Sequence, residues 1–172
     1  LAWEFWFAAT PPALVSYVSD NDIWAHKLPE SRVVTSYIQS WEHSMENWNR
    51  LSQMSQEELI EISKESWRVK QHICSIAAKN AYEVEVRCGS KTTTAAVINI
   101  GFPTTQDVLN RLLESYDMSI GYCRMKDGKW KISVRTNPGA KISAKDYAES
   151  HQGGGHENAA GYVCNATPIY LM

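Results

Sequence analysis

The pattern of apolar and polar positions predicts a chain that starts with helices. Leu14, Val15 and Val18 indicate a short helix after Pro11-Pro12, because proline suits the first turn of a helix, where its missing N–H is not needed. Residues 29–50 carry tryptophans among polar residues and are also predicted to be helical. We therefore expect the first fifty residues to form helices.

A long helix is predicted to follow. Ser55 and Glu58 form a capping box, in which each side chain accepts a hydrogen bond from a free backbone N–H. From there an apolar seam runs along a polar helix to about Asn80, roughly 36 Å at the standard helical rise. The members of the seam are Leu59, Ile62, Ile73, Ile76 and Ala77. One seam with much exposed charge is typical of a connector between two packed units.

The pattern changes after this helix. Strict alternation over 82–86 predicts a strand with one wet face, and an Asp127-Gly128 turn predicts a hairpin between two later strands. The expected elements are strands 82–86, 95–100, 118–124 and 129–135, helices capped by Thr104 (with Asp107) and by Ser143 (with Asp146), and a last strand from Tyr162. The predicted fold class is α+β, with a small mixed sheet and flanking helices.

Composition excludes several classes of protein. The chain has 172 residues, 44% of them hydrophobic, and a net charge of -2, which disfavours disorder and a bulk polyanion binder. No apolar run approaches the roughly 20 residues that span a bilayer, so no membrane association is expected. The four cysteines lie too far apart for a zinc or redox motif and indicate free thiols in an intracellular, reducing compartment. They are Cys74, Cys88, Cys123 and Cys164.

A glycine loop near the C-terminus is the most informative segment. Gly153, Gly154 and Gly155 lack Cβ atoms, so the backbone there can approach a ligand closely, and His156 follows at once. If a helical turn starts at Asn158, its free N–H groups form a nest for a phosphate, to which His156 can donate. The alternative is a flexible loop with one exposed histidine.

A basic stretch precedes the loop. Residues 124–145 contain seven basic side chains and one acidic one, a net charge of +6. Alternation places Ser133 and Arg135 on one strand face, where arginine can bind a phosphate with two hydrogen bonds. The hydroxyls of Ser133 and Thr136 can add further ones. Most of the lysines are expected to be solvated.

A short acidic cluster ends the first predicted helix. The carboxylates of Asp20 and Asp22 are hard oxygen ligands that suit a divalent metal. Such a pair is by itself a weak signal, and a helix C-terminal turn with a surface acid is the alternative.

Together these residues resemble a known family. The segments Gly153–His156, Ala159–Gly161 and Ser133–Arg135 are similar to the DHH-associated domain of DHH-family phosphoesterases. That family includes oligoribonucleases (nanoRNases), cyclic-dinucleotide phosphodiesterases and single-strand exonucleases. Residues 1–7 and 14–24 resemble the end of the family's catalytic domain, so the resemblance covers essentially the whole chain.

The resemblance implies a two-domain, metal-dependent phosphodiesterase. Residues 1–50 would be the remnant of an α/β catalytic domain, 51–80 the connector helix, and 81–172 the substrate-binding domain. The complete enzyme would use manganese, or magnesium, held by Asp and His. Its substrates would be short single-stranded RNA or DNA, or cyclic nucleotides. Asp20 best matches a metal ligand, with Asp22 as second choice. The residues implied to hold the substrate are Ser133, Arg135, Thr136, Gly153, Gly154, Gly155, His156 and Asn158.

The sequence also departs from the family. It contains no Asp-His dipeptide, and a two-metal centre needs more than one aspartate. Alone, the chain is expected neither to retain metal nor to hydrolyse a substrate. It is then either the C-terminal piece of a longer enzyme, as its start at Leu1 suggests, or a degenerate relative that serves as a nucleic-acid-binding or structural subunit. The aromatic residues 3–7 are expected to contact the missing catalytic half or another protein, and a homodimer is possible.

Overall fold

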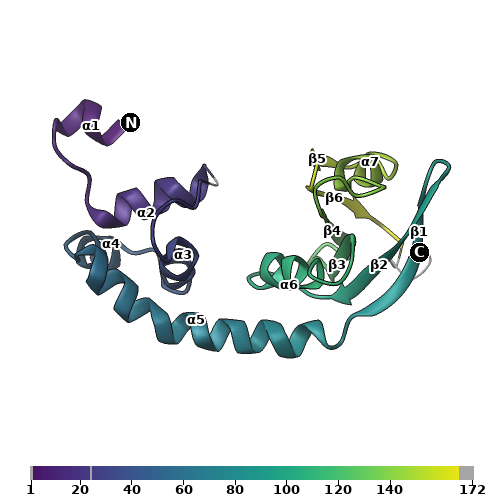
Figure 1. The fold of residues 1–172 in the computed structure, drawn as a ribbon, viewed down its shortest axis with the longest axis horizontal. Helices are drawn as coiled ribbons and strands as arrows, with labels where there is room; N and C mark the ends of the chain where they lie inside the picture. The colour runs from purple at the N-terminus through teal and green to yellow at the C-terminus, as the bar shows by residue number, and fades with distance from the viewer. Residues whose placement is uncertain (1, 24, 167–172) are drawn as a thin grey trace. The chain divides into compact units, whose positions relative to one another are not determined.

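The computed structural model describes residues 2–23 and 25–166. Leu1 and Trp24, which belong to the segments of the family resemblance, lie outside the described residues. The chain forms two units that divide between residues 71 and 72. This division falls inside the long helix α5 (Gln56–Ala78), which contributes residues to both units (Figure 1).

The first unit is helical. Its helices are α1 (Ala2–Phe7), α2 (Ala13–Asp22), α3 (Ser31–Gln39), α4 (Met45–Ser52) and the first part of α5. The short helix predicted after the prolines is α2, and the helical region predicted at 29–50 is divided into α3 and α4. Helices α2 to α5 share one core, made of Leu14, Tyr17, Val34, Ile38, Leu51 and Leu59.

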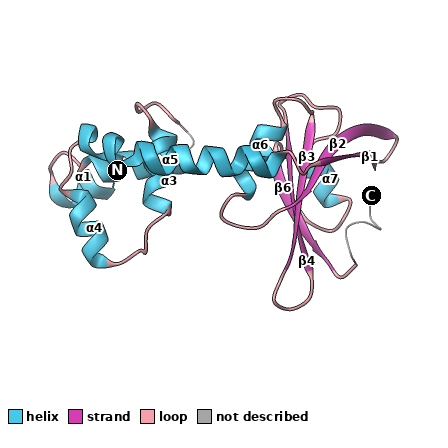
Figure 2. Ribbon diagram, turned by 90° about the horizontal axis from the view of Figure 1, so that it is seen from below, coloured by secondary structure: helices cyan, strands magenta, loops and turns pink. Residues whose placement is uncertain are grey.

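The second unit contains a six-stranded mixed sheet. Its strands are β1 (Tyr82–Cys88), β2 (Lys91–Asn99), β3 (Met118–Arg124), β4 (Trp130–Thr136), β5 (Gly154–His156) and β6 (Ala159–Cys164). They lie in the order β1-β2-β3-β4-β6-β5, and Figure 2 draws the strands in magenta. Strands β2 and β3 are parallel, and the other neighbouring pairs are antiparallel. The predicted α+β class with a mixed sheet behind a long helix is confirmed.

Helices pack on both faces of the sheet. Alternation along β2 sends Ala95 and Val97 to one face and Ala96 and Ile98 to the other. On the first face, α7 (Ala144–Glu149) packs over the sheet. On the second face, α6 (Thr105–Leu112) and the end of α5 cover β2 and β3. This second face carries the candidate site.

The predicted helix caps are mostly confirmed. The backbone N–H of Ser55 donates to Glu58 at 2.8 Å, and that of Glu58 donates to Ser55 at 3.2 Å. Ser143 accepts a hydrogen bond from the N–H of Asp146 at 3.0 Å. Thr104 stands at the cap position of α6, but its side chain makes no capping hydrogen bond there.

The prediction of a single apolar seam along α5 is wrong. Leu59 is fully buried in the core of the first unit, and Cys74 is buried against α6 and β2 in the second. Ile73 and Ile76, by contrast, are about half exposed, at 49% and 50%. The helix has two buried faces because its two ends belong to two cores. Of the helices described, none is both long and apolar enough to cross a membrane.

Candidate functional site

The candidate site lies on the α6 face of the sheet, along β4, β5 and β6. Helix α6 packs on β2 and β3 through Leu109, which lies close to Gly121 of β3. Beyond it, glycines and alanines of β5 and β6 lie beside β4 and leave a hollow of about 440 Å³. The residues that line it are Lys131, Ile132, Ser133, Arg135, Gly154, Gly155, Ala159, Ala160, Gly161, Tyr162 and Val163.

Glycines are required where neighbouring backbone segments of this region lie close together. A Cβ on Gly161 would meet the carbonyl oxygen of Ile132 at 2.5 Å, and one on Gly153 would meet that of Gly161 at 2.3 Å. Gly155 has a φ of +146°, which side chains rarely adopt. The floor of the hollow is therefore made of backbone.

The predicted helical turn after the glycines is wrong. Gly154–His156 is strand β5, and Ala159–Cys164 is strand β6. The two strands pair with each other, Gly155 opposite Ala160. The last strand accordingly starts at Ala159 and not at Tyr162. The glycines allow β5 and β6 to pair closely. The backbone N–H groups that were predicted to form a phosphate nest are therefore part of a β-hairpin.

Arg135 is the main charged group of the hollow. It is half-buried, and one guanidinium nitrogen donates to the carbonyl oxygen of Val134 at 2.9 Å. Among the described residues it has no acidic partner, and no acidic side chain lines the hollow. Burial lowers the pKa of its guanidinium, but arginine stays protonated in proteins. The geometry thus presents a partly desolvated cation with unused N–H donors.

The structure brings four of the predicted substrate residues together at this hollow and leaves the others apart from it. Ser133, Arg135, Gly154 and Gly155 line it. The remaining four lie elsewhere: Gly153 just before β5, His156 exposed at the end of β5, and Thr136 and Asn158 in a network with α7.

The network around Thr136 holds the end of β4. The Thr136 hydroxyl accepts a hydrogen bond from the N–H of Ala144 at 3.3 Å and contacts the side chain of Asn158 at 3.5 Å. The Thr136 N–H donates to the carbonyl oxygen of Asn158 at 3.2 Å. These bonds fix the strand that carries Arg135 against α7 and the β5–β6 turn.

Lys131 and Val163 are among the lining residues that sequence reasoning did not assign to the site. Lys131 shares a strand face with Ser133 and Arg135, so the alternation that placed those two also places Lys131. Val163 lies opposite Lys131 in the β4–β6 pairing and is 51% exposed. Its position depends on the pairing of distant strands, for which the sequence carries no local signal.

Asp20 closes a turn in the helical unit. Its two carboxylate oxygens accept backbone hydrogen bonds from Lys27 at 2.9 Å and from Leu28 at 3.3 Å. Burial alone would raise its pKa, but these two backbone hydrogen bonds help to hold the pKa below the ordinary value. Asp22 is exposed at the end of α2.

The described residues do not fit a metal centre by themselves. Within residues 2–23 and 25–166 no three His, Cys, Asp or Glu side chains gather in a group that could hold a metal ion. The oxygens of Asp20 already accept hydrogen bonds from the backbone. A manganese or magnesium ion would thus need ligands other than those described, and we derive no reaction step through it.

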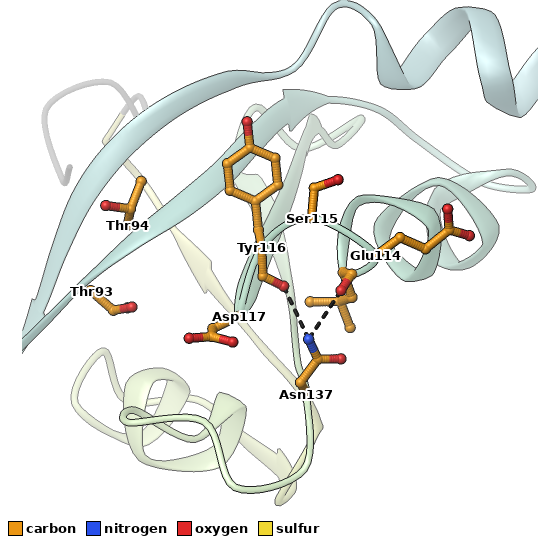
Figure 3. A pocket seen from close by; sticks show the side chains of 8 residues that line it. Thr93, Thr94, Glu114, Ser115, Tyr116, Asp117 and Asn137 are labelled. Carbon is orange, nitrogen blue, oxygen red and sulfur yellow. Dashed lines mark hydrogen bonds between the residues drawn. The ribbon is translucent and has the colours of Figure 1, made fainter.

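A second hollow has the opposite charge. It measures about 480 Å³ and is lined by Thr93, Thr94, Leu113, Glu114, Ser115, Tyr116, Asp117 and Asn137. Figure 3 shows the amide nitrogen of Asn137 donating to two backbone oxygens, those of Leu113 at 3.0 Å and Tyr116 at 3.2 Å. With two carboxylates and no basic residue in its lining, this hollow does not suit a phosphate.

Comparison with known sequences gives one distant relative. No protein-family model matches the chain. The uncharacterized protein R106 of Acanthamoeba polyphaga mimivirus is 26% identical over 168 residues. The match covers 94% of this chain but 39% of that protein, so the chain spans about two fifths of the length of this relative.

Comparison with solved structures identifies the fold. The pGpG-specific phosphodiesterase PggH from Vibrio cholerae superimposes with a TM-score of 0.55 at 10% sequence identity. The match covers 99% of this chain and 68% of that one. The chain therefore shares its fold with the matched part of that protein.

Proposed function

We propose that the chain holds a phosphate of a short oligonucleotide or cyclic nucleotide in the hollow along β4 and β6, as the substrate-binding part of a metal-dependent phosphodiesterase. The observation that carries the proposal is Arg135. It is a half-buried cation without an acidic partner among the described residues, beside a floor made of backbone. A buried charge is unfavourable unless it is paired, and an arginine binds a phosphate through two parallel hydrogen bonds.

Two further observations support this proposal. The fold matches that of a pGpG-specific phosphodiesterase over nearly the whole chain. The residues of the hollow include the Ser133, Arg135 and glycine positions that resemble the substrate-binding motif of DHH-family phosphoesterases. We assign this chain the role of binding and orienting a substrate phosphate, and no step of hydrolysis.

The proposal is tested by calorimetric titration of the chain with pGpG at low salt. Arg135→Ala is expected to weaken binding at least about tenfold, because hydrogen bonds to a charged group contribute about 1.5–3 kcal/mol. Lys126→Ala is the matched control, since Lys126 is an exposed basic residue that does not line the hollow. A wild-type chain that does not bind pGpG, or equal affinities for all three proteins, would contradict the proposal.

A second candidate function is that of a non-catalytic subunit in a larger assembly. The exposed side chains of α1 favour it: Phe5, Trp6 and Phe7 are 80%, 75% and 62% exposed, and contiguous exposed apolar side chains mark contact sites for other proteins. The gene sequence upstream of Leu1 distinguishes the two candidate functions. An upstream reading frame with Asp-His-His supports the phosphodiesterase, whereas a start codon immediately before Leu1 supports the subunit.

A further inference from the structure

The hollow contains a second cation at the far end from Arg135. Strand β4 presents Lys131, Ser133 and Arg135 on the face that lines the hollow. Opposite them on β6 lie Val163, Gly161 and Ala159. On this face of β4, Lys131 and Arg135 therefore place a cation at each end, and the hydroxyl of Ser133 lies between them, opposite Gly161.

Neither cation is neutralised by the residues around it. No acidic side chain lines the hollow, and Lys131 forms no ion pair within the described part of the chain. Its neighbours on the hairpin differ in this respect, because Lys129 lies 3.8 Å from the carboxylate of Asp127. The hollow itself thus holds two uncompensated positive charges.

The distance between the two cations favours a ligand that carries more than one phosphate. Lys131 and Arg135 are four positions apart on β4, which at about 3.3 Å per residue places their Cα atoms about 13 Å apart. One phosphate group cannot contact both side chains in their extended positions. A linear strand can, because its phosphates repeat at intervals of a few ångströms along the backbone.

We propose that Lys131 forms a second phosphate subsite, so that the hollow takes a linear single-stranded oligonucleotide with its backbone along β4. This inference rests on the proposed function, since it assumes that Arg135 binds the first phosphate. The exposed Val163 beside Lys131 gives the sugar or base of that nucleotide an apolar surface. A mononucleotide uses the Arg135 end alone.

The experiment compares two probes, GMP and the trinucleotide pGpGpG, by titration of the full chain. Lys131→Ala is expected to weaken pGpGpG about fivefold, the upper end for an exposed ion pair, and to change GMP affinity less than twofold. The slope of log affinity against log salt for pGpGpG should fall by about 0.7, the value for one single-strand phosphate contact. Lys129→Ala is the matched control and keeps the wild-type affinities for both probes.

The outcomes separate this inference from the proposed function. If Lys131→Ala weakens GMP as much as pGpGpG, or leaves both unchanged while Arg135→Ala weakens both, the second subsite is wrong and the phosphate site at Arg135 stands. If Arg135→Ala has no effect on either probe, or the wild-type chain binds neither, both are wrong. Circular dichroism of each variant verifies that it is folded.

Discussion

At the scale of single residues, the candidate site depends on glycines, whose missing Cβ atoms let backbone segments lie close together. Gly153 and Gly161 admit no Cβ, because a backbone oxygen lies within 2.5 Å of where it would stand. Gly154 is different, since a Cβ built there meets nothing within 4 Å and Gly154 lines the hollow. Two adjacent glycines therefore have different roles, one in packing and one in leaving space for a ligand.

This difference leads to a prediction. Gly154→Val should leave the chain folded but weaken pGpG binding, because its side chain would occupy the hollow. Gly153→Ala should instead destabilise the sheet unit, since its Cβ would stand 2.3 Å from the carbonyl oxygen of Gly161, and overpacking costs about 1–3 kcal/mol. Urea denaturation and calorimetric titration of both variants distinguish the two effects. Unchanged affinity in a folded Gly154→Val variant would show that the ligand binds elsewhere.

At the scale of elements, the contact between α7 and β6 supports the site from behind. Tyr147 of α7 and Tyr162 of β6 have ring centroids 6.4 Å apart, and His151 stacks on Tyr162 at 4.6 Å. The site lies on the front of the same strands, where Gly161 contacts β4. An aromatic layer behind β6 thus keeps the glycine-rich floor in place.

The aromatic layer predicts a loss of stability at alkaline pH. Burial raises the pKa of Tyr162 above its ordinary value of 10.0, and raises that of Tyr147 as well. A raised pKa in the folded state gives stability that is fully present below pH 10 and is lost as the pH rises above it. The urea midpoint of Tyr162→Phe should therefore fall less between pH 9 and pH 11 than that of the wild type. Tyr37→Phe, in the helical unit, is the control and should keep the wild-type dependence. An equal fall in all three proteins would contradict this account.

At the scale of the whole molecule, the helical unit and the sheet unit have cores that share no residue. The core of the helical unit includes Leu51 and Leu59, whereas the two cores of the sheet unit include Ile120 and Leu109. Each unit therefore has its own source of stability, although α5 belongs to both.

Separate cores predict separable effects of core substitutions. Leu59→Ala should destabilise the helical unit by about 2–5 kcal/mol and leave pGpG binding by the sheet unit intact. Ile120→Ala should destabilise the sheet unit by a similar amount and reduce binding as that unit unfolds. Denaturation followed by tryptophan fluorescence, repeated in a Trp130→Phe background that leaves tryptophans in residues 1–71 alone, separates the transition of the first unit from that of the second. A loss of binding in the Leu59→Ala variant under conditions where the sheet unit is folded would contradict this division.

Local patterns in the sequence were sufficient for most of the elements. Alternation predicted β1, the Asp127-Gly128 turn predicted the hairpin of β3 and β4, and the capping residues Ser55 and Ser143 predicted where two helices begin. These signals are reliable because they depend on neighbouring residues, namely the period of a strand or the free N–H groups of a helix start. The glycine segment was predicted as a nest, and the structure makes it a strand, because its conformation depends on pairing with β6.

By itself, the sequence determined the α+β class, the long helix and the placement of Ser133 and Arg135 on one strand face. Only the tertiary structure decided that α6 packs against β2, β3 and β4, and that Lys131 of β4 and Val163 of β6 border the same hollow. The physical reason is the range of the interactions involved. A strand's two faces follow from residues two positions apart, whereas the residues that border a hollow follow from the order of strands that lie far apart in the chain.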